Sequence, residues 1–204
     1  MQPTATIQET VDSIIALYMH YGSEDYIGEP VSQIEHMCQC AQLAEANGAD
    51  DETVLAAFFH DIGHLCEFAF PQAGLDHMDN FGIVDHEKLG SFFLLDKGFS
   101  GNIAKMVASH VAAKRYLTYK FPAYYDVLSD ASKKTLEHQG GRMTEAEAMV
   151  FEQDPLFHSF IAIRRWDDMA KEQHKPLPPL EYFRQLMIAH LSTQHNWAQW
   201  PNAE

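Results

Sequence analysis

The sequence predicts an all-α fold, on three observations that hold along the whole chain. Apolar residues recur at spacings of three and four, the period of an amphipathic helix. Residues that favour helix N-caps precede several of these segments, and glycine follows several of them. Nothing alternates apolar and polar residues as a half-buried strand would, and there is no repeat or low-complexity stretch. We therefore expect one helical domain over residues 1–204, with a motif-bearing core at about 22–192.

Three helices are expected in the first third of the chain. TIQETVDSIIALYMHYG follows helical spacing and ends at a glycine. The second helix has Pro30 in its first turn, where proline is tolerated, and ends at Asn47-Gly48, a typical C-cap. The third is expected to be continuous over residues 51–66, after an N-cap at Asp50.

Residues 67–85 are rich in Gly, Pro, Asp and Asn and have no sustained period, which predicts a loop that could act as a lid. Helical patterns then resume, and Thr144 with Glu147 forms a capping box. Further helices are expected within residues 86–98, 100–117, 129–140, 144–154, 155–172 and 179–192.

The composition limits the possible partners. Lys and Arg total 14 against 29 Asp and Glu, a formal charge of −15, which argues against nucleic acid and anionic membranes. An anionic substrate would need a local cluster of positive charge. The 12 histidines are many for 204 residues, and histidine is the commonest metal ligand.

The cysteines and the N-terminus predict a cytoplasmic protein. Cys38, Cys40 and Cys66 form no even disulfide framework, so we expect buried free thiols in a reducing compartment. No basic segment precedes the first apolar residues, and no run approaches the roughly 20 apolar residues that span a bilayer.

The stretch AAFFHDIGHLC places polar residues inside an apolar segment. A buried carboxylate is costly unless it is paired or bound to a cation, so Asp61 needs a partner. His60 is adjacent, and His64 lies four residues after His60 on the same face of the expected helix. A metal site explains this convergence, although such a pattern is also common by chance.

Further candidates lie in or beside other amphipathic segments. Any one of them alone would more often be an ordinary buried or surface polar residue. Together they form an ordered series along the chain: His36, His60, Asp61, His86, His110 and Asp167.

This series resembles the ligand set of the HD-domain superfamily, an all-helical metalloprotein fold. The resemblance implies that Asp61 bridges two metals. It places His36, His60 and Asp167 on one metal with Asp61, and His86 and His110 on the other. A shared anion between two dications, with N and O ligands and open positions, agrees with this assignment.

Three further features resemble the mixed-valent diiron oxygenases of that superfamily, which cleave organophosphonates with an Fe2+/Fe3+ pair. In YIGEPVSQIEH, the resemblance implies that Tyr26 covers one iron until substrate arrives and that Glu29 meets the substrate's ammonium group. Lys114 follows His110 by one helical turn, and Arg164 precedes Asp167 by three residues.

Lys114 and Arg164, with His64, are therefore expected to bind a phosphonate. Ser132 and Thr135 match the region that supplies a phosphonate-contacting hydroxyl in the family, although Ser132 also fits the first turn of a helix.

The resemblance implies a small organophosphonate and O2 as partners and predicts no oligomeric state. The expected reaction converts (R)-1-hydroxy-2-(trimethylammonio)ethylphosphonate to glycine betaine and phosphate; the alternative is 2-amino-1-hydroxyethylphosphonate, giving glycine and phosphate. Aromatic residues suited to cation–π contact with a quaternary ammonium favour the first. These are Tyr21, Tyr26, Phe68, Tyr116, Tyr119, Phe121, Tyr124 and Tyr125.

Two other functions stay open on the sequence. An HD phosphohydrolase with a redox-inert metal would use the same N and O ligands. A non-catalytic HD regulatory module would be expected to have lost catalytic groups, whereas every expected ligand and flanking cation is present.

Overall fold

The predicted all-α fold is confirmed by the computed structural model, which describes residues 5–26, 28–69, 78 and 84–198. Within these ranges the chain forms eleven helices and one isolated bridge, between Asp25 and Ser32. The helices are α1 (Ile7–Tyr21), α2 (Gln33–Ala46), α3 (Asp51–Phe59), α4 (Ile62–Ala69), α5 (His86–Asp96), α6 (Gly101–Lys120), α7 (Pro122–Val127), α8 (Asp130–His138), α9 (Glu145–Phe151), α10 (Phe157–Met169) and α11 (Leu180–Ala198).

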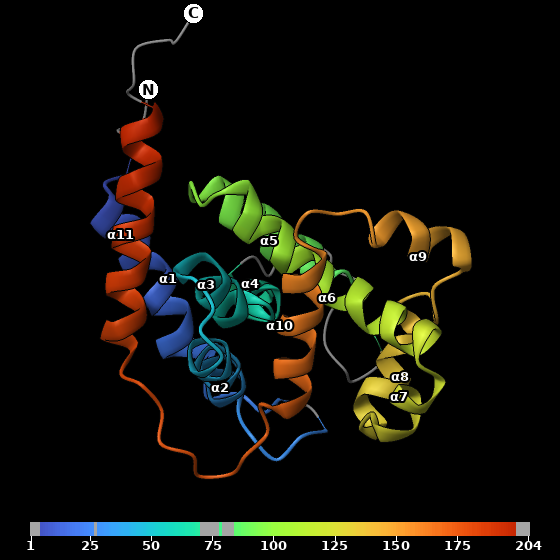
Figure 1. Ribbon diagram of the computed structural model, residues 1–204. Coiled ribbons are helices and arrows are strands. Elements are labelled where there is room, and N and C mark those ends of the chain that lie inside the picture. The colour runs from blue at the N-terminus through green and yellow to red at the C-terminus, as the bar shows by residue number, and fades with distance from the viewer. Residues whose placement is uncertain (1–4, 27, 70–77, 79–83, 199–204) are drawn as a thin grey trace, which may run out of the picture.

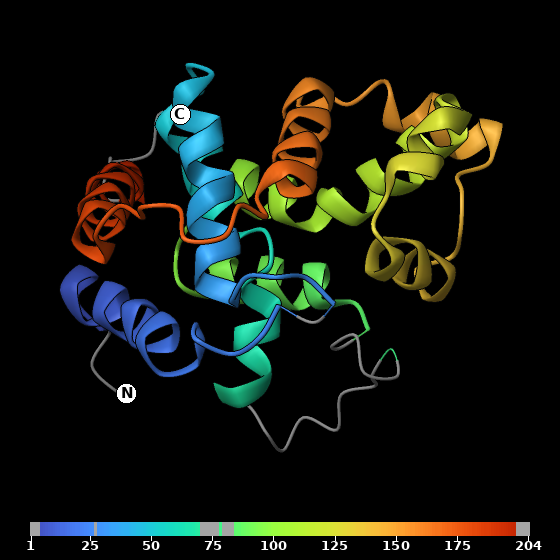
Figure 2. The ribbon, with the colours of Figure 1, turned by 90° about the horizontal axis from the view of Figure 1, so that it is seen from below.

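The helices that carry the predicted metal ligands lie together at the centre of the molecule. α6 packs against α3, α5 and α10, while α2 packs against α3 and α10, and α4 against α5. α1 and α11 lie side by side on one flank, and α7, α8 and α9 lie at the opposite end (Figures 1 and 2). The central helices thus bring together residues that are more than a hundred positions apart in sequence.

An aromatic stack joins this centre to the flanking helices. Phe58 of α3 lies between Tyr18 of α1 and Phe183 of α11, with ring centroids 4.4 and 3.9 Å apart. The Tyr18 hydroxyl donates a hydrogen bond of 2.9 Å to the backbone carbonyl of Phe58. All three side chains are buried, so α3 is held firmly at the residues that lead into the HD pair.

The most informative difference from the sequence-based prediction is a break in the third helix. Residues 51–66 were predicted to be continuous, but α3 ends at Phe59 and α4 begins at Ile62. His60 and Asp61 form the junction, so His64 does not follow His60 on one helical face. Apolar spacing is the same on both sides of the junction, and so it does not reveal the break.

Other helix ends differ by a few residues. α2 begins at Gln33 after a Ser32 N-cap, so Pro30 precedes the helix instead of lying in its first turn. α10 ends at Met169, three residues before the predicted end. The N-cap at Asp50 and the capping box of Thr144 with Glu147 are confirmed.

The predicted lid falls mostly outside the described residues. Of residues 67–85, the first three belong to α4, and residues 70–77 and 79–83 are not described. Cys38, Cys40 and Cys66 are buried free thiols, as expected. None of the helices in the described ranges is long and apolar enough to cross a membrane.

Candidate metal centre and substrate pocket

The junction between α3 and α4 aims two adjacent side chains into the centre of the bundle. His60 and Asp61 are 0% and 2% exposed. Gly63, just after them, lies so close to α5 that a Cβ atom there would be 1.9 Å from the carbonyl oxygen of His86. Only glycine permits this approach. Gly63 therefore lets Asp61 and His86 face each other.

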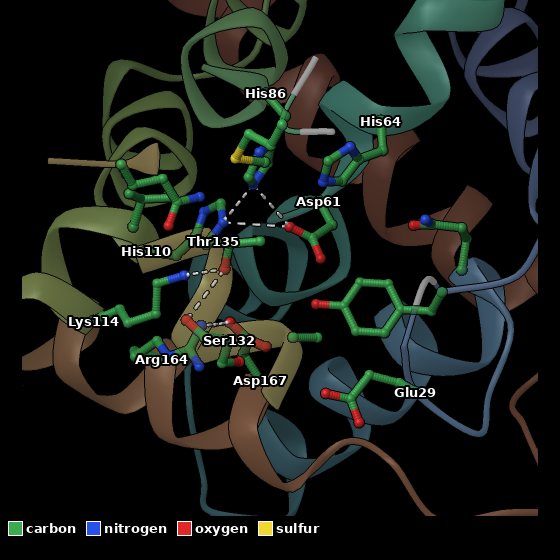
Figure 3. Close-up of a pocket in the computed structure, with 16 residues that line it drawn as sticks. Glu29, Asp61, His64, His86, His110, Lys114, Ser132, Thr135, Arg164 and Asp167 are labelled. Atoms are coloured by element: carbon green, nitrogen blue, oxygen red, sulfur yellow. Dashed lines mark hydrogen bonds and ion pairs between the residues drawn. The ribbon is translucent and has the colours of Figure 1, made fainter. Parts of the chain in front are cut away.

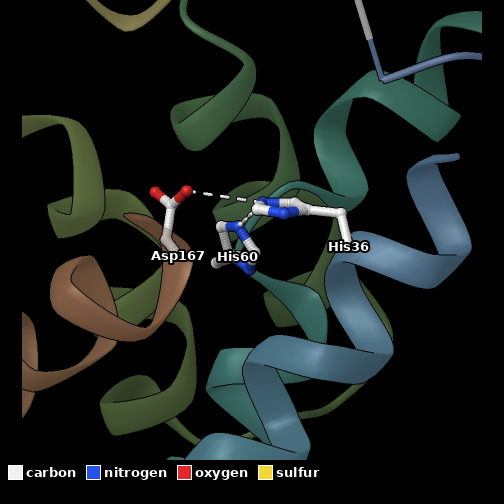
Figure 4. Close-up of side chains that lie close together, drawn as sticks. All are labelled: His36, His60 and Asp167. Carbon is white, nitrogen blue, oxygen red and sulfur yellow. Dashed lines mark hydrogen bonds and ion pairs between the residues drawn. The ribbon is translucent and has the colours of Figure 1, made fainter. Parts of the chain in front are cut away.

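The first group of donors consists of His36, His60 and Asp167 (Figure 4). The Nε2 atoms of His36 and His60 are 3.0 Å apart, and His36 Nε2 is 3.4 Å from Asp167 Oδ1. The three residues come from α2, the α3–α4 junction and α10, and all are buried. Three long-range segments thus converge on one point.

The second group consists of His86 and His110, which face one oxygen of Asp61 (Figure 3). Their Nε2 atoms are 3.0 Å apart, and each is 3.3 Å from Asp61 Oδ1. The other oxygen, Oδ2, is 3.5 Å from His36 Nε2 and 3.4 Å from His60 Nε2. One carboxylate therefore spans both groups, with one oxygen facing each.

The hydrogen bonds behind these histidines suit a set of metal ligands. The Nδ1 atoms of His36, His60 and His110 lie 3.0, 2.8 and 2.8 Å from backbone carbonyl oxygens. Carbonyl oxygens only accept hydrogen bonds, so in the neutral imidazoles Nδ1 carries the proton and Nε2 presents a lone pair. Facing lone pairs at 3.0 Å repel each other unless a cation lies between them.

The distances between the histidine Nε2 atoms also suit metal binding. Two ligands at about 2.1 Å from a metal and at right angles to each other are about 3 Å apart. The Nε2 pairs are 3.0 Å apart in both groups. Asp61 Oδ2 is also buried with no hydrogen-bond partner among the described residues. The set of one shared carboxylate, four imidazoles and a second carboxylate suits a pair of divalent metal ions.

His64 lies beside the second group. Its ring stacks on that of His86 with centroids 4.0 Å apart. Donor atoms of Asp61, His64 and His86 lie within 4.8 Å of one another, so these three residues also form a group that could hold a metal ion. Burial lowers the pKa of His64 well below its ordinary value, which leaves a neutral imidazole. Its role as a substrate contact stays a prediction.

A pocket opens directly onto the donors, and it brings together the residues predicted to bind the phosphonate with Tyr26 and Glu29. Asp61, His86, His110 and Asp167 form part of its wall. The predicted substrate contacts that also line it are Tyr26, Glu29, His64, Lys114, Ser132, Thr135 and Arg164, most of them labelled in Figure 3. The Tyr26 ring stacks on His36 with centroids 4.0 Å apart, so this tyrosine lies beside the first donor group.

Two basic side chains, Lys114 and Arg164, line this pocket. Arg164 is paired with carboxylates, whereas the Lys114 nitrogen forms no ion pair with a carboxylate among the described residues. Lys114 is 3% exposed, and its Nζ donates a 2.8 Å hydrogen bond to Thr135 Oγ1. Burial, and then the nearby charge of Arg164, lower the pKa of Lys114 to about 7. A buried ammonium of this kind gains from the arrival of an anion.

Arg164 has a different environment from the one expected. It was predicted to bind the phosphonate, and it does line the pocket. However, its guanidinium donates 2.6 Å from Nη1 to Asp167 Oδ2, from Nη2 to Asp168, and 3.0 Å from Nε to the Tyr124 hydroxyl. Its main visible action is to orient the metal-facing carboxylate of Asp167.

Several residues of the pocket wall were not predicted from the sequence. Gln33 and Gln139 line it, and each has a buried side-chain oxygen without a hydrogen-bond partner in the described ranges. Met78 also lines it and is 1% exposed. Amide residues at helix ends have no sequence signature, so only the fold reveals them.

The aromatic residues proposed for a quaternary ammonium are mostly elsewhere. Tyr26 is the one member of that set among the described pocket residues. Tyr21 stacks on Phe68 at 4.8 Å, and Tyr116 packs on Phe157 at 5.2 Å. These residues form no aromatic cage in the part of the pocket that the structure describes, and the preference for a quaternary amine stays a prediction.

Comparison with known proteins gives a family and several relatives. Residues 34–155 match the HD domain. The uncharacterized protein L432 of Acanthamoeba polyphaga mimivirus is 44% identical over 190 residues, covering 93% of this chain and 85% of the relative. A protein of Leisingera caerulea named (1-hydroxy-2-(trimethylamino)ethyl)phosphonate dioxygenase (glycine-betaine-forming) is 38% identical over 173 residues, 85% of this chain and 86% of the relative. Hydroxymethylphosphonate dioxygenase of Gimesia maris is 38% identical over 177 residues, 86% of this chain and 85% of the relative.

Proposed function

This chain belongs to the HD-domain family of metal-dependent oxygenases, and we propose that it uses two iron ions and dioxygen to cleave the carbon–phosphorus bond of a 1-hydroxyphosphonate. The observation that carries the proposal is the Asp61 carboxylate, whose two oxygens face two separate groups of imidazoles beside a pocket with a buried lysine. The names of the two phosphonate dioxygenases at 38% identity support the same chemistry.

In this proposal His36, His60, Asp61 and Asp167 hold one iron, and Asp61, His86 and His110 hold the other. When bound as a mixed-valent Fe2+/Fe3+ pair, the metals would supply the redox chemistry that a C–P bond requires and that simple hydrolysis lacks. The chain itself contributes position and charge.

Lys114 is the group proposed to bind the phosphonate. Its ammonium is buried and lies one helical turn from His110. The hydroxyls of Ser132 and Thr135 and the His64 ring line the same wall and would donate or accept the remaining hydrogen bonds. Arg164 acts through Asp167, which it holds at 2.6 Å. Tyr26, stacked on His36, would cover the first metal position until substrate enters.

The reaction balances with one molecule of dioxygen and no added reductant. The C–P bond breaks, the hydroxylated carbon becomes a carboxylate and phosphorus leaves as phosphate. One oxygen atom goes to each product, and for hydroxymethylphosphonate the products are formate, phosphate and one proton.

The far end of the substrate distinguishes three candidates. The sequence favours a trimethylammonium group, giving glycine betaine, with the primary amine, giving glycine, as the alternative. The relative from Gimesia maris is named for hydroxymethylphosphonate, which has no group at that end. All three share the hydroxyl and phosphonate that the pocket wall at Lys114 would bind.

Phosphate release from each of the three phosphonates, with and without dioxygen, tests the proposal. The iron-loaded protein should release phosphate from at least one of them only when dioxygen is present, and should consume one dioxygen per phosphate. A phosphate monoester serves as the control substrate. Equal release without dioxygen, or faster release from the ester, would instead support a phosphohydrolase.

A further inference from the structure

Glu29, expected to meet a substrate ammonium, already has a cationic partner within the chain. Lys171 Nζ donates to Glu29 Oε1 at 2.6 Å. The side chains are 17% and 8% exposed, so water screens the pair only weakly. The carboxylate that forms one wall of the pocket is therefore neutralised before any substrate arrives.

The backbone on both sides of Lys171 is fixed to α2. Before it, the carbonyl of Ala170 accepts the 3.0 Å hydrogen bond from His36 Nδ1. After it, Glu172 and Gln39 exchange two hydrogen bonds of 2.9 Å, one from the Glu172 N–H and one to its carbonyl. Lys171 thus lies between two anchored residues, and its position relative to Glu29 depends on the same segment that orients a predicted metal ligand.

This ion pair changes which substrate group the pocket can bind beside Glu29. A substrate ammonium that approached Glu29 would meet a carboxylate whose charge is compensated, with a second cation directly beside it. It would have to displace Lys171, or share the carboxylate against the repulsion of two positive charges. An uncharged group meets neither cost.

The small number of aromatic side chains in the pocket also argues against a quaternary ammonium. A quaternary ammonium is typically held by several aromatic faces. In the part of the pocket that the structure describes, Tyr26 is the single aromatic side chain other than the histidines, and its ring is stacked on His36. The described pocket lining also includes the amides of Gln33 and Gln139.

We infer that Lys171 is a specificity-determining residue that neutralises Glu29, so that the chain acts on a 1-hydroxyphosphonate with no cationic group at the end remote from phosphorus. Hydroxymethylphosphonate is the smallest such compound. The inference rests on the proposed function and deepens it. It replaces the trimethylammonium preference suggested by aromatic composition with an assignment based on one ion pair.

The test compares three substrates on four proteins: the parent, Lys171→Met, Lys171→Arg and the control Lys175→Met. Lys175 lies in the same segment but pairs with Glu172, away from Glu29. For each protein, kcat/KM is measured for hydroxymethylphosphonate, 2-amino-1-hydroxyethylphosphonate and its trimethylated form. The Kd of each compound is measured by calorimetry without dioxygen, and thermal unfolding checks that each variant is folded.

The parent should prefer hydroxymethylphosphonate by about tenfold or more in kcat/KM and Kd. Lys171→Met frees the Glu29 carboxylate, so the preference should shift by at least about tenfold toward the ammonium compounds. Lys171→Arg keeps the charge and should retain the parent's order, as should Lys175→Met.

Two results would overturn the inference while leaving oxidative C–P cleavage intact. One is a parent protein that prefers an ammonium compound; the other is a Lys171→Met variant whose ratio of kcat/KM for the ammonium compounds to that for hydroxymethylphosphonate stays within about twofold of the parent's. If none of the compounds yields phosphate in a dioxygen-dependent way, the proposed function fails, and the ratios of Kd still decide whether Lys171 sets the charge preference.

Discussion

The metal side and the substrate side of the pocket are built in different ways. On the metal side, the predicted ligands come from the central helices or the α3–α4 junction, and each residue is at most 4% exposed. Three of the histidines also have a backbone carbonyl oxygen within hydrogen-bond distance of Nδ1. On the substrate side, Glu29 lies in a turn before α2, Ser132 on the short helix α8 and Lys171 in the segment after α10. Glu29 and Lys171 are joined by a side-chain ion pair, and Ser132 lines the pocket from the first turn of α8.

The difference separates residues that should act on every substrate from residues that should select among substrates. Backbone carbonyls hold a histidine in the same way whatever the substrate, so the metal side can stay constant while the chemistry is kept. Pairs such as Lys171 with Glu29 depend on two side chains, and one substitution changes their charge. Substitutions on the metal side should therefore affect all substrates, and those on the substrate side should affect selection among them.

Asp61→Asn should have the largest effect. It keeps the shape of the side chain but removes the charge shared by the two donor groups, so metal content should fall from two ions per chain to one or none. Activity on every phosphonate should fall by more than the ~10–100-fold typical of residues behind metal ligands. Metal analysis and kcat/KM measure this. Asp12→Asn, on the surface beside Arg184, is the control and should retain both ions. An Asp61→Asn protein with two ions would contradict the bridging role.

Gly63→Ala should disturb the metal side through the backbone. The added methyl would lie 1.9 Å from the His86 carbonyl oxygen, so α4 and α5 must separate. Such overpacking costs about 1–3 kcal/mol and should lower Tm by about 2–12 °C, with weaker metal binding. In Gly101→Ala the methyl meets open space, and Tm should not fall. Equal thermal unfolding curves for the two variants would contradict the close approach.

Lys114→Met should weaken substrate binding without changing metal binding, and so should separate the two sides of the pocket. Loss of a charged hydrogen bond to phosphonate costs about 1.5–3 kcal/mol, so kcat/KM should fall about 10–100-fold for all three substrates. Metal content should stay at the parent level. Lys105→Met, on the exposed side of the same helix, is the matched control. Loss of metal from Lys114→Met would show that the two sides are not separable.

Tyr124→Phe should have the smallest effect. Its hydroxyl accepts from Arg164 Nε at 3.0 Å, and Arg164 in turn orients Asp167, two steps from the metal. The variant loses this hydrogen bond and the one that the hydroxyl donates to Asp168. Each costs about 1 kcal/mol and neither involves a predicted metal ligand directly, so we expect a less than tenfold fall in metal affinity. A competition titration with a chelator measures it. Tyr182→Phe, which loses a surface bond to Glu45, should leave the affinity unchanged; an equal fall in both variants would remove Tyr124 from this network.

The fold and the metal side of the pocket were easier to predict from the sequence than the substrate side. Helical period predicted the all-α fold, and the ordered histidines and aspartates predicted a set of side chains that the fold brings together. The break at His60–Asp61 was missed, because apolar residues continue through it. Lys171 was missed because it was placed inside a helix that ends at Met169. Arg164 was assigned to the phosphonate from its spacing to Asp167, and that role stays a prediction; the spacing did not reveal Asp168 and Tyr124, with which its guanidinium also forms hydrogen bonds.

The most direct test of the central claim is the fate of labelled dioxygen. The iron-loaded protein is given hydroxymethylphosphonate under ¹⁸O₂, and the phosphate and formate are analysed by mass spectrometry. Oxidative cleavage predicts one labelled oxygen atom in each product, since three oxygens of phosphate and one of formate come from the substrate. Phosphate that carries no ¹⁸O, formed together with methanol instead of formate, would contradict the claim and identify the reaction as hydrolysis.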